Sequence, residues 1–131
     1  MKQSILTKIE RREITVGVVG LGYVGLPLAV EKAKAGFRTI GFDVQEYKVL
    51  MVNEGKNYIG DVVDSELASL VERGILSATT DFSFVGDVDF VAICVPTPLD
   101  EHQQPDISYV ESSVKSMAQY IKRGTMVVLE S

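Results

Sequence analysis

Three glycines carry the clearest chemical signal in this sequence. Gly20, Gly22 and Gly25 form the pattern G-x-G-x-x-G directly after the apolar, β-branched run Ile14–Val19. Such a run is typical of a strand buried on both faces. We expect Gly20 to allow a sharp turn, Gly22 to let the backbone approach a pyrophosphate, and Gly25 to let a helix pack closely on the strand. The N–H groups at the start of that helix are suited to binding the phosphates.

An acidic residue stands where a nucleotide bound at this turn would need one. Asp43 follows a predicted second strand, Thr39–Phe42, and lies 18 residues after Gly25. A carboxylate at about this distance accepts hydrogen bonds from the adenosine ribose hydroxyls and repels a 2′-phosphate. The pattern therefore predicts a dinucleotide site that prefers NAD to NADP. The alternative is a strand–helix–strand unit whose glycines serve packing and whose Asp43 only caps the next helix.

Lys48 is a second candidate for contact with the nucleotide. It lies on a short helix predicted over Gln45–Asn53. If that helix begins directly after the second strand, Lys48 faces the glycine turn and is able to reach the ribose or phosphate region. A solvated lysine on an amphipathic helix fits the spacing equally well.

A proline-bounded threonine follows the most continuous apolar strand in the chain. Pro96-Thr97-Pro98 comes directly after Phe90–Val95, at the strand edge where open α/β sheets bind ligands. The prolines stiffen the loop and leave Thr97 with a hydroxyl and an N–H to offer. An ordinary loop is the alternative. His102, the only histidine, has no nearby Ser, Cys or second His, so we interpret it as a solvated loop residue.

These residues are positioned by alternating strands and helices. Beyond the segments already given, apolar periodicity predicts the helices Val24–Gly36, Asp61 or Ser65 to Arg73, and Asp106–Lys122, and the strands Leu76–Thr80 and Thr125–Leu129. We expect Leu50 to be buried in the second helix, Val63 in the third and Val114 in the last. Right-handed crossovers then predict an α/β fold, a Rossmann-type doubly wound parallel sheet with strand order 3-2-1-4-5. Its crevice, between the first and fourth strands, would collect the glycine turn, Asp43 and Thr97.

Composition narrows the class of protein. The chain has 131 residues, enough for one domain, with 46% hydrophobic and 24% charged residues. A net charge of −5 argues against binding to nucleic acid or an anionic membrane, and no apolar run approaches a membrane span. Residues 1–13 form a polar lead-in without the apolar core of a signal peptide, and one cysteine excludes an internal disulfide. Together these features predict a cytoplasmic protein without a metal cluster.

Three motifs in combination resemble a known family. Gly-Leu-Gly-Tyr-Val-Gly-Leu-Pro at 20–27, Gly-Phe-Asp at 41–43 with Lys48 five residues on, and Val-Pro-Thr-Pro at 95–98 resemble the N-terminal domain of the UDP-glucose/GDP-mannose dehydrogenase family. The resemblance covers nearly everything from Ile14 to Ser131. Ala-Thr-Thr-Asp at 78–81 and Thr-Pro-Leu-Asp-Glu-His at 97–102 look most like the branch that oxidises UDP-N-acetylglucosamine or UDP-N-acetylmannosamine.

The resemblance implies an activity and a set of site residues. Members of the family oxidise the 6-hydroxyl of a nucleotide sugar to a carboxylate with two NAD, through a cysteine-bound intermediate. Carried onto this chain, the loop would hold the pyrophosphate, Asp43 the adenosine ribose, Lys48 the same end of the cofactor, and Thr97 the nicotinamide side. The implied cofactor residues are Gly20, Leu21, Gly22, Tyr23, Val24, Gly25, Asp43, Lys48, Pro96 and Thr97. The full-length protein would be a homodimer or a larger homo-oligomer.

The family's catalytic cysteine and substrate residues lie in a second domain, beyond residue 131. Cys94 falls in a predicted buried strand without a neighbouring base, so we interpret it as a small core residue. The chain is thus expected to be an NAD-binding domain, 1–131, that is inactive alone. Alternatives are a UDP-glucose 6-dehydrogenase, another NAD-dependent hydroxyacid dehydrogenase, and a non-catalytic module that senses NAD.

Overall fold

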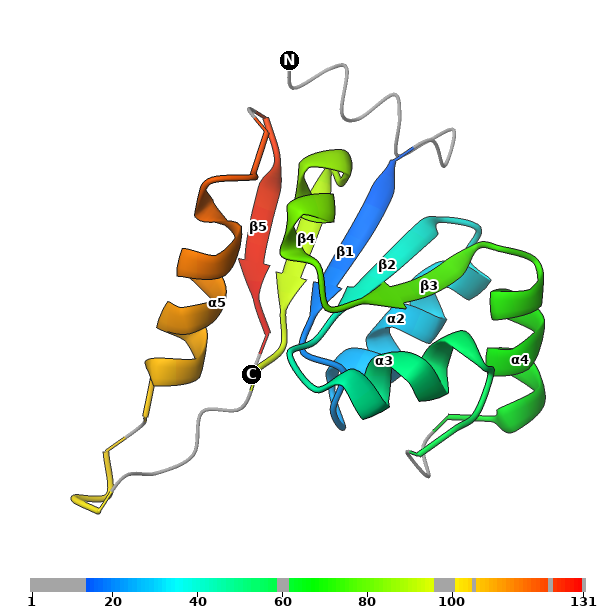
Figure 1. The fold of residues 1–131 in the computed structure, drawn as a ribbon, viewed down its shortest axis with the longest axis horizontal. Coiled ribbons are helices and arrows are strands. Elements are labelled where there is room, and N and C mark those ends of the chain that lie inside the picture. Colours follow the sequence, from blue (N-terminus) through cyan, green and yellow to red (C-terminus); the bar gives the residue numbers. More distant parts are fainter. Residues whose placement is uncertain (1–13, 59–61, 96–100, 105, 123, 131) are drawn as a thin grey trace.

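A five-stranded parallel sheet forms the centre of the protein (Figure 1). The computed structural model describes residues 14–58, 62–95, 101–104, 106–122 and 124–130. The sheet order is β3-β2-β1-β4-β5, which confirms the predicted order 3-2-1-4-5. In the central register Val18 of β1 lies opposite Gly41 of β2 and Ala92 of β4. The strands are β1 (Thr15–Val19), β2 (Arg38–Phe42), β3 (Leu76–Thr79), β4 (Phe90–Ile93) and β5 (Met126–Leu129).

The connecting helices have sharp, glycine-dependent ends. They are α2 (Gly25–Lys34), α3 (Glu46–Asn53), α4 (Asp64–Glu72), the 3₁₀ helix η1 (Phe82–Asp87) and α5 (Ser108–Ala118). The first three are each followed by a glycine with positive φ: Gly36 at 99°, Gly55 at 72° and Gly74 at 74°. After α2, Gly36 N donates to Ala33 O and the next N–H, of Phe37, donates to Lys32 O. This is the Schellman pattern, and α3 and α4 end in the same way.

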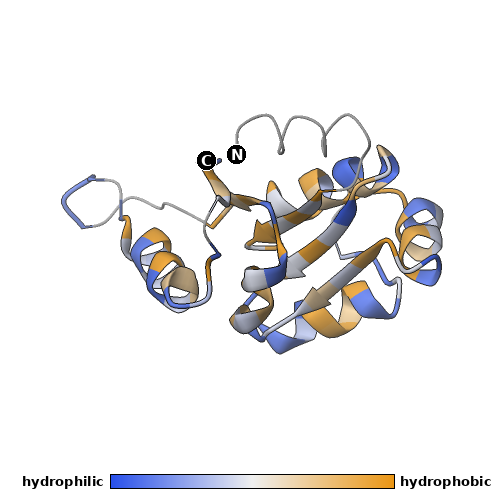
Figure 2. Ribbon diagram, turned by 90° about the horizontal axis from the view of Figure 1, so that it is seen from above, coloured by the Kyte–Doolittle hydropathy of each residue, from blue (hydrophilic) through white to orange (hydrophobic). Residues whose placement is uncertain are grey.

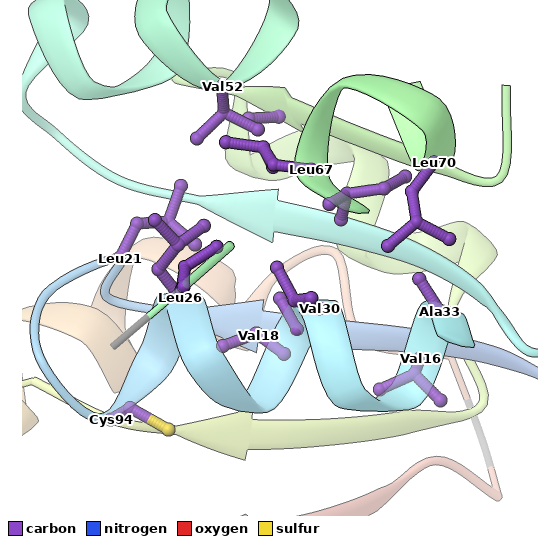
Figure 3. Packing of buried hydrophobic residues seen from close by; sticks show 14 of the residues in the cluster. Val16, Val18, Leu21, Leu26, Val30, Ala33, Val52, Leu67, Leu70 and Cys94 are labelled. Atoms are coloured by element: carbon purple, nitrogen blue, oxygen red, sulfur yellow. The ribbon is translucent and has the colours of Figure 1, made fainter. Parts of the chain in front are cut away.

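The sheet is covered on both faces by separate apolar clusters. One cluster joins β1 and β3 to α2, α3 and α4, and includes Leu26 and Leu67, both fully buried. Figure 3 shows Leu70 of α4 pointing toward Ala33 of α2, and the labelled side chains of α2 lying beside Val16 and Val18 of β1. The other cluster joins β2 and β4 to η1 and α5 through Phe42, Val85 and Met117. Burying one such side chain contributes about 1.5–3 kcal/mol. Figure 2 shows that the surrounding helices carry both hydrophobic and hydrophilic residues.

Three predicted core positions are wrong. Val114 of α5 is 44% exposed, Leu50 of α3 is 51% exposed, and Val63, which directly precedes α4, is 54% exposed. The buried side of α5 runs through Ser113 and Met117, so Val114 lies at the edge of that face. In α3 the buried residues are Val49 and Val52, which leaves Leu50 on the outer side. The predicted lead-in at 1–13 lies outside the described residues. Among the described helices, none has both the length and the apolar character that a membrane span requires.

Candidate functional site

A cavity of about 460 Å³ opens where the carboxyl ends of β1, β2 and β4 meet. Its walls come from the turn after β1, the residues after β2, the residues after β4, and one face of α5. The sheet order alone explains this convergence, because the chain reverses direction across the sheet between β1 and β4. Of the predicted site residues, the cavity is lined by Gly20, Leu21, Gly22, Tyr23, Val24, Asp43 and Lys48.

The glycine turn has three distinct local geometries. Gly20 has φ of 94°, and a Cβ there would lie 2.9 Å from Cys94 O. A Cβ on Gly25 would collide with the carbonyl oxygen of Gly20, so α2 begins in direct contact with the turn. A Cβ on Gly22 would meet nothing within 4 Å, because this glycine faces open space. Gly20 thus forms the turn, Gly25 lets α2 pack against it, and Gly22 leaves the space beside the turn open to a ligand.

The first residues of this turn leave backbone donors available. The N–H groups of Gly22, Tyr23 and Val24 make no hydrogen bond with other described residues. Tyr23 is 80% exposed and Val24 is 46% exposed, so neither side chain covers the turn. The start of α2 adds the positive end of its dipole to these donors. The arrangement is suited to a phosphate group, which needs several donors and gains from positive potential.

The Asp43 carboxylate is almost buried and is held by the backbone. Oδ2 accepts from Leu21 N at 2.8 Å and Oδ1 accepts from Gln45 N at 2.8 Å. Gln45 is the N-cap residue of α3, and no side-chain capping bond is present there. Asp43 therefore holds the turn before α3 and does not itself cap the helix, as the alternative interpretation required. These two contacts leave acceptor capacity free, because a carboxylate has about four acceptor positions. Asp43 also lines the cavity, so both roles are compatible.

Lys48 lies on the first turn of α3 and lines the cavity. Its ammonium makes no ion pair or hydrogen bond with another described residue, so it is available to an anion. Pro96 and Thr97 lie outside the described residues, and their predicted role stays a prediction. His102 is 78% exposed and pairs with Glu101 at 3.5 Å. No group of three or more His, Cys, Asp and Glu in the described ranges is placed to hold a metal ion.

Cys94 is buried at the end of β4 and borders the cavity. It lies one residue after the strand, and its N–H still donates to Val19 O at 2.7 Å. Burial, with a smaller effect from the charge of Glu130, raises the pKa of its thiol to about 11. The thiol is therefore neutral at physiological pH and a poor nucleophile.

Sequence reasoning missed two contributions to the site. The first is one face of α5, which lines the cavity on the side opposite α2 through Tyr109, Ser112 and Ser116. Their spacing of three and four residues puts them on one helix face, a signal that was available from the sequence. The second is Tyr58, whose hydroxyl donates to Leu21 O at 2.7 Å. No local sequence pattern predicts that hydrogen bond, because 37 residues separate the two partners.

A parallel α/β sheet with a glycine turn, a following acid and a cavity at its switch point defines a dinucleotide-binding domain. Residues 14–131 match the model of the UDP-glucose/GDP-mannose dehydrogenase family, NAD binding domain. The chain belongs to this family, and NAD is its cofactor.

Similar proteins include enzymes that act on several nucleotide sugars. The NDP-N-acetyl-D-galactosaminuronic acid dehydrogenase of Ralstonia nicotianae is 40% identical over 118 residues, covering 89% of this chain and 27% of the relative. The UDP-N-acetyl-D-mannosamine dehydrogenase of Escherichia coli K12 is 40% identical over 121 residues, with the same coverage of 89% and 27%. The structure of a UDP-D-ManNAc dehydrogenase from Pyrococcus horikoshii gives a TM-score of 0.82 at 30% identity, covering 90% of this chain and 28% of that one. The chain thus spans about a quarter of the length of these relatives.

Proposed function

We propose that this chain is the cofactor-binding domain of an NAD-dependent nucleotide-sugar 6-dehydrogenase. The observation that carries the proposal is the cavity that joins the glycine turn, Asp43 and Lys48 in a chain of this family. The complete enzyme would oxidise the 6-hydroxyl of a UDP-sugar to a carboxylate and use two NAD per sugar. A UDP-N-acetylhexosamine is the favoured substrate, because the two similar enzymes named above act on N-acetylated sugar nucleotides.

Each site residue has a binding role in this proposal. The free N–H groups of Gly22, Tyr23 and Val24 would donate to the pyrophosphate, and Lys48 would add a positive charge at the same end. Asp43 would accept from the adenosine ribose hydroxyls while it keeps its two backbone donors. Leu21 shapes the turn between them, and Pro96 and Thr97 would lie at the nicotinamide side. When bound, NAD supplies the hydride acceptor, and these residues hold and orient it.

The described residues supply binding, and the single cysteine of the sequence is not a catalytic nucleophile. The neutral, buried thiol of Cys94 is unsuited to forming a covalent intermediate. We propose that the nucleophile and the sugar-binding residues belong to another domain of a longer protein, and that this protein forms homo-oligomers. The 131 residues alone are then expected to bind NAD and to oxidise nothing.

Calorimetric titration of the chain with NAD and with NADP tests the cofactor site. We expect NAD to bind at least about ten-fold more tightly, a difference of about 1.4 kcal/mol. The reason is that the 2′-phosphate of NADP would lie against the Asp43 carboxylate. A preference for NADP would overturn the role given to Asp43 and favour a different dehydrogenase family.

The variant Gly22→Val tests the glycine turn separately. Its Cβ has room in the fold but occupies the open space that a pyrophosphate needs, so NAD affinity should fall at least about ten-fold with little change in melting temperature. Gly74→Val is the matched control. It lies after α4 with φ of 74°, so the substitution should destabilise the fold and leave NAD affinity unchanged. Undiminished NAD binding in a folded Gly22→Val chain would remove the turn from the site.

The sugar is identified with the complete enzyme that contains this domain. NADH formation is followed with UDP-N-acetylglucosamine, UDP-N-acetylmannosamine and UDP-glucose, and two NADH per sugar mark full oxidation to the acid. Turnover with UDP-glucose alone would replace the N-acetylhexosamine assignment by a UDP-glucose 6-dehydrogenase. Turnover of a hydroxyacid instead would overturn the nucleotide-sugar proposal.

A further inference from the structure

The backbone of Leu21 is held on both sides of its Cα, at its N–H and at its carbonyl oxygen. Leu21 N donates to Asp43 Oδ2 at 2.8 Å, and Leu21 O accepts from the Tyr58 hydroxyl at 2.7 Å. Asp43 follows β2, whereas Tyr58 lies beyond α3, five residues after its last residue Asn53. Two distant segments therefore fix one residue of the glycine turn.

The side chain of Leu21 is held as firmly as its backbone. It is 1% exposed and belongs to the cluster beneath α2, where Figure 3 shows it beside Leu26. It also lies directly over Gly41 of β2, because a Cβ on that glycine would be 2.7 Å from Leu21 Cδ2. The residue has little freedom to rotate about its own backbone, so the orientation of its carbonyl is set by the surrounding structure.

The geometry of a trans peptide carries this orientation to the next residue. The described chain has no cis peptide bond, so the carbonyl of Leu21 and the N–H of Gly22 point in opposite directions in one plane. Gly22 lines the cavity, and Tyr58 is absent from its described lining. When Tyr58 holds the carbonyl on its own side, the N–H of Gly22, a residue that lines the cavity, is directed away from Tyr58.

Tyr58 is itself well placed to keep this contact. Its ring meets the edge of the Tyr47 ring at a centroid distance of 6.5 Å and an angle of 61°. Burial, followed by the nearby charges of Asp43 and Tyr47, raises the pKa of its hydroxyl above the usual range. The hydroxyl therefore stays protonated and remains a donor at physiological pH.

We propose that Tyr58 is a positioning residue for the pyrophosphate of NAD, acting through the Leu21–Gly22 peptide without touching the cofactor. This inference rests on the proposed function, since it assumes that the glycine turn binds the pyrophosphate. It predicts that loss of the hydroxyl weakens phosphate recognition and leaves recognition of the nucleoside unchanged.

The test compares two matched variants, Tyr58→Phe and Tyr47→Phe. Each removes one hydroxyl and keeps the ring, and the Tyr47 hydroxyl makes no hydrogen bond with a described residue. Binding of ADP to the purified chain is measured by calorimetry, and binding of adenosine by NMR chemical shifts. We expect Tyr58→Phe to bind ADP about three- to ten-fold more weakly and adenosine as before. Tyr47→Phe should bind both like the unaltered chain.

A direct readout comes from the amide resonance of Gly22. Adding ADP should shift this resonance in the unaltered chain and in Tyr47→Phe, and shift it less in Tyr58→Phe at saturation. Equal losses for ADP and adenosine would show a general structural defect and overturn the positioning role. Unchanged ADP affinity in Tyr58→Phe would overturn it while leaving the proposed function intact. If the unaltered chain bound no ADP, both the inference and the cofactor site would be wrong.

Discussion

At the residue scale, the Asp43 carboxylate combines a structural contact with the binding role proposed for it. Its two oxygens satisfy the N–H groups of Leu21 and Gln45, and it borders the cavity. Asp43→Ala should therefore weaken NAD binding by about 1–3 kcal/mol and also lower the melting temperature. The first effect is the loss of hydrogen bonds to a charged group, and the second is the exposure of two unpaired donors. Calorimetry and thermal unfolding measure them separately.

Asp81 provides a matched control for that variant. Its Oδ1 accepts from Ser83 N at 2.9 Å at the start of η1, so it also binds the N–H two residues further along the chain, but it does not line the cavity. Asp81→Ala should lower stability and leave NAD affinity unchanged. If Asp43→Ala behaved in the same way, Asp43 would have a structural role only.

Cys94 gives a prediction that depends on pH. Its pKa rises from 9.0 to about 11, so at pH 8 about 100-fold less thiolate is present than at an ordinary cysteine. Alkylation by iodoacetamide at pH 8 should be slower by about this factor than alkylation of the urea-unfolded chain. Because the folded pKa is the higher one, Cys94 leaves stability unaffected below pH 9 and lowers it between pH 9 and 11. Equal alkylation rates in the two states would show that the thiol is exposed.

At the element scale, the side chain of Asn53 joins α3 to the edge strand β3. Its Nδ2 donates to Ala78 O at 2.9 Å, and its Oδ1 accepts from Ala78 N at 2.8 Å. The amide therefore pairs with β3 as a neighbouring strand would. Asn53→Ala should lower the free energy of unfolding by about 2 kcal/mol, since both backbone groups lose their partner. Urea unfolding measures this change, and Asn53→Asp, which keeps the acceptor, should lose about half as much. An unaffected Asn53→Ala chain would contradict the role.

The elements themselves were predictable because each has a local signal. The strands were predicted from short β-branched runs. The helix ends were predicted from Gly36 and Gly74, whose positive φ completes the Schellman pattern. The side that each helix buries was less predictable. Periodicity placed Val114 in the core, but the face of α5 that meets the sheet is centred on Ser113 and Met117. That choice depends on how the helix sits on its neighbours, which the sequence of the helix does not encode.

In the site, too, features set by the local sequence were predictable and contacts between distant segments were not. Gly20, Gly22 and Asp43 were found because a turn or a strand end constrains each one locally. Tyr58 was not found, since its role exists only when the loop after α3 reaches the turn after β1. Contacts between residues far apart in the chain can be predicted only once the order of the strands in the sheet is known.

At the scale of the whole molecule, the cavity exists only when the sheet is assembled. Its walls come from chain segments after β1, β2 and β4 and from α5, so the unfolded chain has no equivalent site. A ligand that binds only the folded state stabilises it by RT ln(1 + [L]/Kd), about 2.7 kcal/mol at a hundred-fold excess over Kd. NAD at that concentration should raise the melting temperature by roughly 10 °C for a domain of this size.

Ligands that differ by one group show which part of the cavity gives this stabilisation. ADP-ribose should reproduce most of the NAD shift, because it keeps the adenosine ribose and the pyrophosphate. NADP at the same concentration should give a much smaller shift, because its 2′-phosphate meets Asp43. In Asp43→Ala the difference between the NAD and NADP shifts should narrow, since the repelling carboxylate is gone. Equal shifts for NAD and NADP in the unaltered chain would mean that the adenosine ribose binds away from Asp43, outside the crevice formed by β1, β2 and β4.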